Sequence, residues 1–273
     1  MQVREALAQA LSKGVARLDA QWLLGHLLNQ ARPWLLAHDD AELPPAAGAA
    51  WPDLLARRAA GEPLAYVLGQ TEFCGLTLQV SAAVLVPRPE TEGLVDWAIE
   101  CLAIAPAATV VDLGTGSGAI ALAIRQRQPQ AQVWATDNSA PALAVAQANA
   151  QRLGLPLHVA QGDWWHALSP RRFGLAVCNP PYIAAHDPHL HALGHEPLDA
   201  LTPGGDGLDA LRQIINGAPA HLLPGAWLLL EHGHDQAAAV QDMLLQAGFV
   251  APQTRPDLAG LARCSGAHWP SAK

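Results

Sequence analysis

The stretch Val110-Val111-Asp112-Leu113-Gly114-Thr115-Gly116-Ser117-Gly118-Ala119 is an apolar run that meets alternating glycines and then continues as a helical pattern. A short apolar run bounded by glycine is typical of a buried strand. Glycine adopts positive φ readily and lets a backbone pass close to a ligand. The stretch therefore predicts a strand, a tight ligand-binding turn and a helix.

Outward from this stretch, strand and helix patterns alternate, which predicts an α/β fold with a mostly parallel sheet covered by helices on both faces. Ligands of such sheets bind beyond the carboxyl ends of the strands. The glycine turn after Leu113 and the segment after Cys178 both follow such ends, so we expect them to face one crevice. The expected strands are 109–113, 132–136, 157–161, 173–178, 226–231, 249–253 and one near 263–267, and the expected helices are 119–128, 141–153, 208–223 and 236–246.

The N-terminal part, residues 1–75, has apolar residues at helical spacing and predicts a small all-helical domain. Residues 76–86 alternate apolar and polar side chains, which predicts a β-hairpin connector with its turn near Ser81. Residues 87–273 then form the main domain. We expect the core of the helical domain to include Trp22, Leu23, Leu24, Leu27 and Leu28.

Composition narrows the class of protein. The chain has 273 residues and a net charge of −8, and this acidic balance argues mildly against a duplex DNA partner. Its four cysteines are dispersed without paired spacing, which favours free thiols in a reducing compartment. The N-terminus lacks a signal-peptide pattern and no apolar run is long enough to span a bilayer, so we expect a cytoplasmic protein with no membrane partner.

The segment Asn179-Pro180-Pro181-Tyr182 directly follows the expected strand 173–178. Proline has no N–H for a sheet ladder and restricts the residue before it, so the segment is a stiff strand end. It offers an amide side chain, main-chain carbonyls and an aromatic ring, which together suit a planar –NH2 group. The alternative is a proline-terminated strand that enters a surface loop.

The glycine turn suits two cofactors. Gly114, Gly116 and Ala119 also satisfy a dinucleotide-binding pattern, so a nicotinamide enzyme has to be considered. Asp112, however, would face a pyrophosphate unfavourably, whereas it suits the cationic aminoacyl group of S-adenosylmethionine. Asp137 ends the next strand, where its two oxygens can accept from ribose hydroxyls of either cofactor.

The third strand end, Asp163-Trp164-Trp165, is expected at the adenine. Asp163 can accept from the exocyclic amine and Trp164 can cover the ring, whereas we expect Trp165 in the core. Glu231, at the end of the strand 226–231, either lines the crevice or only closes its strand. No metal is expected, because the loop histidines match no ligand spacing; they are His186, His189, His191 and His195.

The motifs 112–118 and 179–182 together resemble the amino-methyltransferase branch of the Rossmann-like methyltransferases, a branch that includes DNA adenine methyltransferases. Three further stretches resemble the peptide chain release factor glutamine methyltransferases. They are the helical N-terminal part, Val86-Pro-Arg-Pro-Glu-Thr91, and Gly205-Asp-Gly-Leu-Asp209 followed by an apolar helix. The resemblance covers nearly the whole chain.

The resemblance implies methylation of the glutamine side-chain amide nitrogen in the Gly-Gly-Gln motif of class I release factors, with S-adenosylmethionine as the donor. We also expect a monomer and, from the acidic balance and the lack of a separate target-recognition domain, no DNA partner. It implies catalytic roles for Asn179, Pro180 and Tyr182. Donor contacts are implied for Gly114, Thr115, Gly116, Ser117, Gly118, Asp137, Trp164 and Asn179, and we add Asp112 and Asp163. Glutamine contacts are implied for Asn179, Pro180, Pro181 and Tyr182, with Arg88 and Glu90 as a substrate gate.

The chain departs from this family at Gly194-His195-Glu196-Pro197, which lacks the arginine and aromatic residue that often precede the Glu-Pro pair. The departure concerns how the loop from Asp187 meets the substrate. Two other functions stay open: methylation of a ribosomal-protein glutamine or of adenine in nucleic acid, and a donor-binding module without catalysis.

Overall fold

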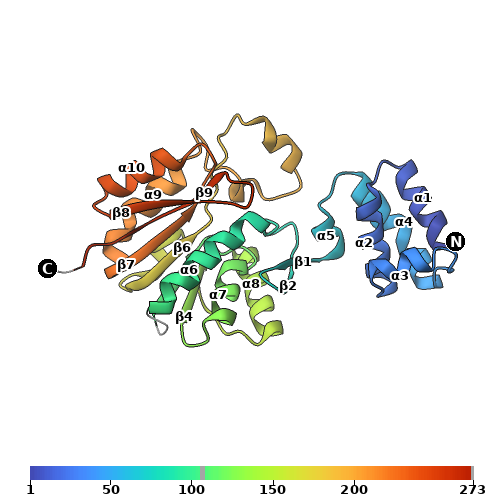
Figure 1. Cartoon of the computed structure of the whole chain (residues 1–273), viewed down its shortest axis with the longest axis horizontal. Helices are drawn as coiled ribbons and strands as arrows, with labels where there is room; N and C mark the ends of the chain where they lie inside the picture. Colours follow the sequence, from blue (N-terminus) through green and yellow to red (C-terminus); the bar gives the residue numbers. More distant parts are fainter. Residues whose placement is uncertain (105–107, 272–273) are drawn as a thin grey trace. The chain divides into compact units, whose positions relative to one another are not determined.

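A computed structural model of the chain describes residues 1–104 and 108–271. These residues fall into two compact units, Met1–Gln70 and Thr71–Lys273 (Figure 1). The division lies earlier than the boundary expected at residue 75, because the hairpin that follows the helices already starts at Gln70.

The first unit is all-helical, as predicted. Its helices are α1 (Val3–Ser12), α2 (Arg17–Leu28), α3 (Arg32–Ala37), α4 (Pro45–Ala59) and α5 (Leu64–Leu68). Their apolar faces enclose Leu23, Leu24 and Trp51, and the Trp51 indole donates to Gln9 Oε1 at 2.8 Å. The expectation that Trp22 belongs to this core is wrong, because its side chain is 49% exposed and Arg32 lies over its ring. Helix α2 is apolar on nearly every side, so periodicity did not indicate which side faces inward.

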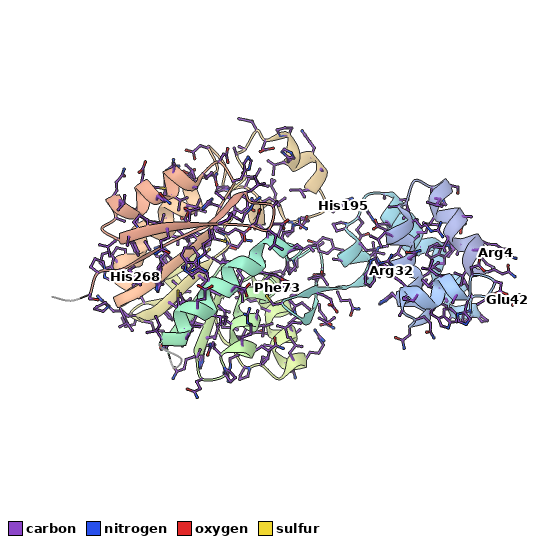
Figure 2. The ribbon with its side chains drawn as sticks, in the orientation of Figure 1. Arg4, Arg32, Glu42, Phe73, His195 and His268 are labelled. Carbon is purple, nitrogen blue, oxygen red and sulfur yellow. The ribbon has the colours of Figure 1, made fainter. Side chains whose placement is uncertain are left out.

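A two-stranded hairpin of β1 (Gln70–Phe73) and β2 (Leu76–Gln79) follows, and its turn is Cys74-Gly75. Both turn residues have positive φ, as a tight hairpin requires. The predicted hairpin at 76–86 was wrong in position, since strand pairing ends at Gln79. A turn does form after Ser81, where Val84 N–H donates to the Ser81 carbonyl. The buried Val84 and Val86 that produced the alternation lie in an irregular segment, whereas Phe73 (Figure 2) anchors β1 in the core.

The described part of the second unit contains a seven-stranded sheet of order β5-β4-β3-β6-β7-β9-β8. β9 runs antiparallel to both of its neighbours and β3 to β7 are parallel, so the prediction of a mostly parallel sheet is confirmed. The strands are β3 (Thr109–Leu113), β4 (Gln132–Asp137), β5 (His158–Gln161), β6 (Phe173–Cys178), β7 (Leu222–Glu231), β8 (Val250–Pro256) and β9 (Ala262–His268).

Helices cover both faces of this sheet (Figure 1). One core contains Trp97, Leu122 and Leu175 beneath α6 (Glu92–Ile104), α7 (Ala119–Arg127) and α8 (Ala140–Leu153). The other contains Leu113, Ile214 and Phe249 beneath α9 (Asp209–His221) and α10 (Ala237–Gln246). The expected helices therefore form within a few residues of their predicted bounds.

The order of the strands reverses next to β3. The chain runs outward from β3 through β4 to β5 and then returns to β6 on the other side of β3. Leu113 is the pairing partner of Cys178, so the glycine turn and the Asn179–Tyr182 segment leave adjacent strands at one edge. This is the switch point at which doubly wound sheets bind ligands, and the expectation that the two loops face one crevice is confirmed.

Candidate active site

A cavity of about 510 Å³ lies at this switch point. It is lined by both loops, by residues 82–85 and Pro87, and by Pro197, Asp199 and Ala200. The sequence-predicted residues that line it are Gly114, Thr115, Gly116, Ser117, Asp137, Asp163, Trp164, Asn179 and Pro181.

The glycine turn wraps this cavity with positive φ at Gly114, Gly116 and Gly118. Gly118 does not line the cavity. It begins α7, and a Cβ there would lie 3.2 Å from the Ala146 side chain, so its role is to let α7 and α8 approach each other.

Asp112 lies beneath the turn and is fully buried. Its Oδ2 accepts from Thr115 Oγ1 at 2.6 Å and from Ala121 N–H at 3.2 Å. Burial raises the pKa of Asp112 to about 7. Oδ1 is buried and has no hydrogen-bond partner among the described residues. Asp112 does not itself line the cavity, and it supports the turn from within the sheet.

Asp137 ends β4, and its carboxylate links the glycine turn to the N-terminus of α8. Its Oδ2 accepts from Gly116 N–H and its Oδ1 from Ser139 N–H, both at 2.9 Å. Burial raises the pKa of Asp137 above its ordinary value. Each carboxylate oxygen has a further lone pair, so the side chain can still accept two hydroxyl groups.

The two adjacent tryptophans have different surroundings. Trp164 lines the cavity, and a Cβ built on Gly114 would lie 3.1 Å from its Cζ3, so only glycine lets the indole lie this close to the turn. Trp165 is buried, and its Nε1 donates to the Ile214 carbonyl at 2.8 Å, which confirms its place in the core.

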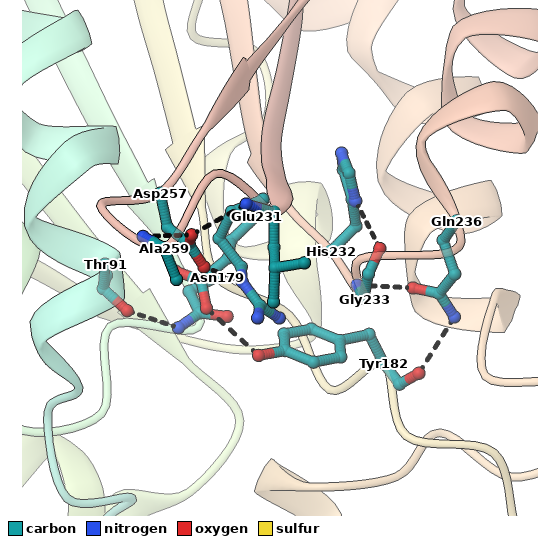
Figure 3. Close-up of polar contacts among 11 residues, drawn as sticks. Thr91, Asn179, Tyr182, Glu231, His232, Gly233, Gln236, Asp257 and Ala259 are labelled. Atoms are coloured by element: carbon teal, nitrogen blue, oxygen red, sulfur yellow. Dashed lines mark hydrogen bonds and ion pairs between the residues drawn. The ribbon is translucent and has the colours of Figure 1, made fainter.

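The Asn179–Tyr182 corner is held from three other segments (Figure 3). Asn179 Nδ2 donates to Thr91 Oγ1 at 3.1 Å, and the Tyr182 hydroxyl donates to Glu231 Oε1 at 3.1 Å. The main-chain carbonyl of Tyr182 accepts from Gln236 Nε2 at 3.0 Å. Burial is the main reason that the pKa of Tyr182 is raised above its ordinary value. Pro180 and Tyr182 do not line this cavity; Pro180 is buried and Tyr182 is partly exposed.

Gly207, in the segment 205–209, packs directly against the Asn179–Tyr182 corner. Its φ is +83°, and a Cβ at this position would lie 2.4 Å from the Tyr182 carbonyl oxygen. That separation is far below van der Waals contact, so only glycine fits against the corner.

Arg88 and Glu90 both lie outside the cavity lining. The Arg88 guanidinium forms an ion pair with the nearly buried Glu196, whose Oε2 also accepts from Val86 N–H at 3.1 Å. Arg88 therefore ties the segment before α6 to the loop that contributes Pro197 to the cavity. Glu90 is exposed on the short 3-10 helix η1 (Pro89–Thr91).

Sequence reasoning gave no role to Thr91 or Gln236 and left that of Glu231 open. Thr91 belongs to the 86–91 motif, so that motif was the available signal. Glu231 is an acid at a strand end and is 1% exposed. Its hydrogen bond to Tyr182 joins β7 to a loop far away in the chain, so no local pattern in the sequence indicates it.

Across residues 1–104 and 108–271, no group of three or more His, Cys, Asp or Glu side chains could hold a metal ion. In the same residues, no helix has the length and apolar character needed to cross a bilayer.

Two family models match this chain. The methyltransferase small domain model matches residues 96–208, which contain both loops of the cavity, and the PrmC N-terminal domain model matches residues 1–69. A methyltransferase from Pyrococcus furiosus has the same fold, with a TM-score of 0.54, 16% identity and coverage of 72% of this chain and 90% of its own. A T. thermophilus 16S rRNA methyltransferase in complex with AdoMet and guanosine gives a TM-score of 0.55, 20% identity and coverage of 73% and 49%. The chain is thus a Rossmann-like methyltransferase.

Relatives narrow the class to a family. The release factor glutamine methyltransferase of Bordetella pertussis is 51% identical over 93% of this chain and 96% of its own length. That of Xylella fastidiosa (strain Temecula1) is also 51% identical, over 96% of this chain and 98% of its own. The chain belongs to the release factor glutamine methyltransferase family. It is an enzyme whose methyl donor is S-adenosylmethionine, and the open turn at Gly116 and the Asp137 carboxylate, which both line the cavity, fit this group.

Proposed function

We propose that this enzyme methylates the side-chain amide nitrogen of the glutamine in the Gly-Gly-Gln motif of class I release factors. The relatives named above support the substrate class. The observation that carries the chemistry is the hydrogen bond from Asn179 Nδ2 to Thr91, because it leaves Asn179 Oδ1 as an acceptor at the cavity.

An amide nitrogen is a weak nucleophile because its lone pair is delocalised into the carbonyl group. In the proposed site, Asn179 Oδ1 and the Pro180 carbonyl accept the two amide hydrogens of the substrate glutamine. These acceptors stabilise positive charge that develops on the nitrogen and fix its direction of attack. The donor, when bound, supplies an electrophilic methyl group on a sulfonium; the N–C bond forms as the S–C bond breaks, and the nitrogen then loses a proton to water.

The other side chains position the two reactants. Residues 114–117 would hold the aminoacyl end of the donor, with Asp112 and Gly118 fixing the shape of the turn. Asp137 would accept from the ribose, and Asp163 and Trp164 would bind the adenine. Tyr182 and Pro181 pack beside the glutamine amide. Arg88 acts by fixing the loop at Glu196, and Glu90 lies at the approach of the substrate.

The substrate is tested with radiolabelled donor and purified release factor, ribosomal proteins and DNA in parallel, followed by mapping of the modified residue. We expect label on the release factor glutamine. Label on a ribosomal-protein glutamine or on adenine would replace the proposed substrate, and donor binding without transfer would identify a module without catalysis. N179D is expected to bind donor but to turn over far more slowly, since a carboxylate has no N–H to donate to Thr91 Oγ1 and the contact that orients the acceptor is lost.

We further propose that the enzyme acts as a cytoplasmic monomer and that the helical unit docks the release factor. The exposed Trp22 is the residue to test, because a large apolar side chain in water gains by burial against a partner. W22A should raise the KM for the release factor and leave the donor Kd unchanged. An unchanged KM would contradict a role for this face, and light scattering on the eluted enzyme tests the monomer.

A further inference from the structure

His232 is a buried histidine that the proposed function does not use. It directly follows β7 and is 0% exposed. Its Nδ1 lies 2.8 Å from the Gly233 carbonyl oxygen (Figure 3), and its Nε2 lies 2.8 Å from Ser265 Oγ. A carbonyl oxygen only accepts, so Nδ1 carries a proton. Burial lowers the pKa of His232 below its ordinary value, which favours the neutral ring, and in that ring Nε2 accepts.

The protons beyond Nε2 have one consistent direction. Ser265 donates its single hydroxyl proton to Nε2, so its oxygen accepts from Thr254 Oγ1, which lies 2.6 Å away. Thr254 in turn accepts from Gln241 Nε2 of α10 at 2.7 Å. This chain of hydrogen bonds crosses β8 and β9 and ends on His232. Because each member has its partner, the chain fixes one tautomer of the ring, with the proton on Nδ1.

The Nδ1–H of His232 holds the turn that follows it, from Gly233 to Gln236. The Gly233 carbonyl also accepts from Gln236 N–H at 2.9 Å, so both of its lone pairs are used. In the same turn, Gly233 N–H donates to Gln236 Oε1 at 2.8 Å. A Cβ on Gly233 would lie 3.1 Å from that oxygen, so glycine gives the Gln236 side chain room to fold back over the turn.

Gln236 links this turn to the Asn179–Tyr182 corner. A backbone N–H can only donate, so the bond from Gly233 fixes the oxygen end of the Gln236 carboxamide on the turn. The NH2 end is left to donate to the Tyr182 carbonyl at 3.0 Å (Figure 3). With the amide reversed, its oxygen would face the carbonyl oxygen and the contact would be lost.

We propose that His232 is a positioning residue for methyl transfer. Its Nδ1–H fixes the Gly233 carbonyl, and the turn held in this way directs Gln236 Nε2 to the Tyr182 carbonyl. The corner is then held at Tyr182 as well as at Asn179. This role rests on the proposed function, which places the substrate amide at the corner.

The test measures kcat and donor Kd for H232A, H232N, Q236E and the double variant H232A/Q236E. H232A removes the donor to the Gly233 carbonyl. Q236E keeps an acceptor for Gly233 N–H but has no hydrogen for the Tyr182 carbonyl. H232A and Q236E should each lower kcat by about 10- to 100-fold, because a misplacement of about 1 Å can cost about 100-fold in rate. Donor Kd should stay unchanged.

Two variants serve as controls. The amide of H232N can replace the Nδ1–H donor, so this variant should regain most of the activity that H232A loses. H234A removes an exposed histidine of the same turn and should keep wild-type kcat. The double variant H232A/Q236E should be no slower than the slower single variant, since both changes break one series of contacts.

Several results would overturn the inference. Wild-type kcat in H232A or in Q236E would show that the link does not position the corner. H232N as slow as H232A would show that the Nδ1–H bond is not the cause. Effects of H232A and Q236E that multiply would show that His232 acts independently of Gln236. Should H232A fail to fold, as judged by circular dichroism, either a slow H232N or wild-type turnover by Q236E would contradict the inference.

A readout without substrate separates this inference from the proposed function. Nitrogen NMR of the His232 ring, assigned by the signals missing from H232N, should show a protonated Nδ1 and an unprotonated Nε2 at neutral pH. A proton on Nε2 alone would contradict the inference even if the release factor is the substrate. Absence of wild-type methylation of the release factor would contradict the proposed function, while the ring tautomer would still decide whether His232 holds the Gly233 carbonyl.

Discussion

The glycine turn after β3 and the Asn179–Tyr182 corner after β6 leave adjacent strands, yet they are stabilised in different ways. The turn is held by Asp112 within its own motif and by Asp137 at the end of the next strand. The corner is held by Thr91, Gln236 and Glu231, which come from segments far away in the chain.

Because of this difference, we expect that substitutions in the two halves of the site impair different functions. Damage to the turn or to the tryptophan beside it should weaken donor binding. Damage to the corner should leave donor binding intact and slow methyl transfer.

The largest expected effect is that of N179A, which removes the proposed acceptor at the reacting nitrogen. Loss of one such aligned group costs about 10²- to 10³-fold in turnover. We expect that fall in kcat with a donor Kd, measured by calorimetry, close to wild type. N216A, an exposed asparagine of α9, is the control and should keep full activity. A parallel rise in donor Kd would show that the two halves are not separable.

G207A tests whether distant packing fixes the corner. The added Cβ meets the Tyr182 carbonyl at 2.4 Å, so the corner must shift, and a displacement of about 1 Å can cost about 100-fold in rate. G204A is the matched control: its φ of +87° is similar, but nothing lies within 4 Å of the added Cβ. Both variants should lose about 1 to 2 kcal/mol of stability from backbone strain, and only G207A should lose activity. Equal activities would contradict the packing argument.

W164A tests the donor half. Loss of a ring stacked on a base costs about 1 to 3 kcal/mol, so the donor Kd should rise by about tenfold or more. W165A, the neighbouring core residue, should instead lower the free energy of unfolding by about 3 to 5 kcal/mol. Thermal unfolding and calorimetry separate the two, and a stable W164A with wild-type donor affinity would remove Trp164 from the donor site.

The smallest expected effect is a pH dependence from Asp112. Its folded pKa of about 7 lies above the ordinary value of 3.8, so its contribution to stability is full below the ordinary value and is lost as the pH rises through about 7. A cationic donor group in the cavity would favour the carboxylate beneath the turn, so donor affinity should rise severalfold between about pH 6 and about pH 8. The slope should disappear in D112N. Equal slopes in both proteins would place the donor cation elsewhere.

The sequence was a good guide wherever a motif and its partners are neighbours. The turn 114–118, Asp137 and Trp164 were found because strand ends and glycine spacing are local signals, and the sheet brings these ends together. Thr91 was assigned no site role and that of Glu231 was left open, because their links to the corner depend on how η1 and β7 pack beside the end of β6. Trp22 and the 76–86 hairpin were misplaced for a related reason: apolar spacing shows that side chains are buried somewhere, not against which element.

The pairing of Leu113 with Cys178 has a consequence for how new specificities could arise. In the proposed site, the loops that bind the methyl donor and the acceptor amide leave neighbouring strands, which lie about 4.8 Å apart in any β-sheet. The spacing of the strands therefore sets the distance between the two binding loops. The surface that recruits the protein substrate can therefore change in evolution while the distance between the two loops stays the same.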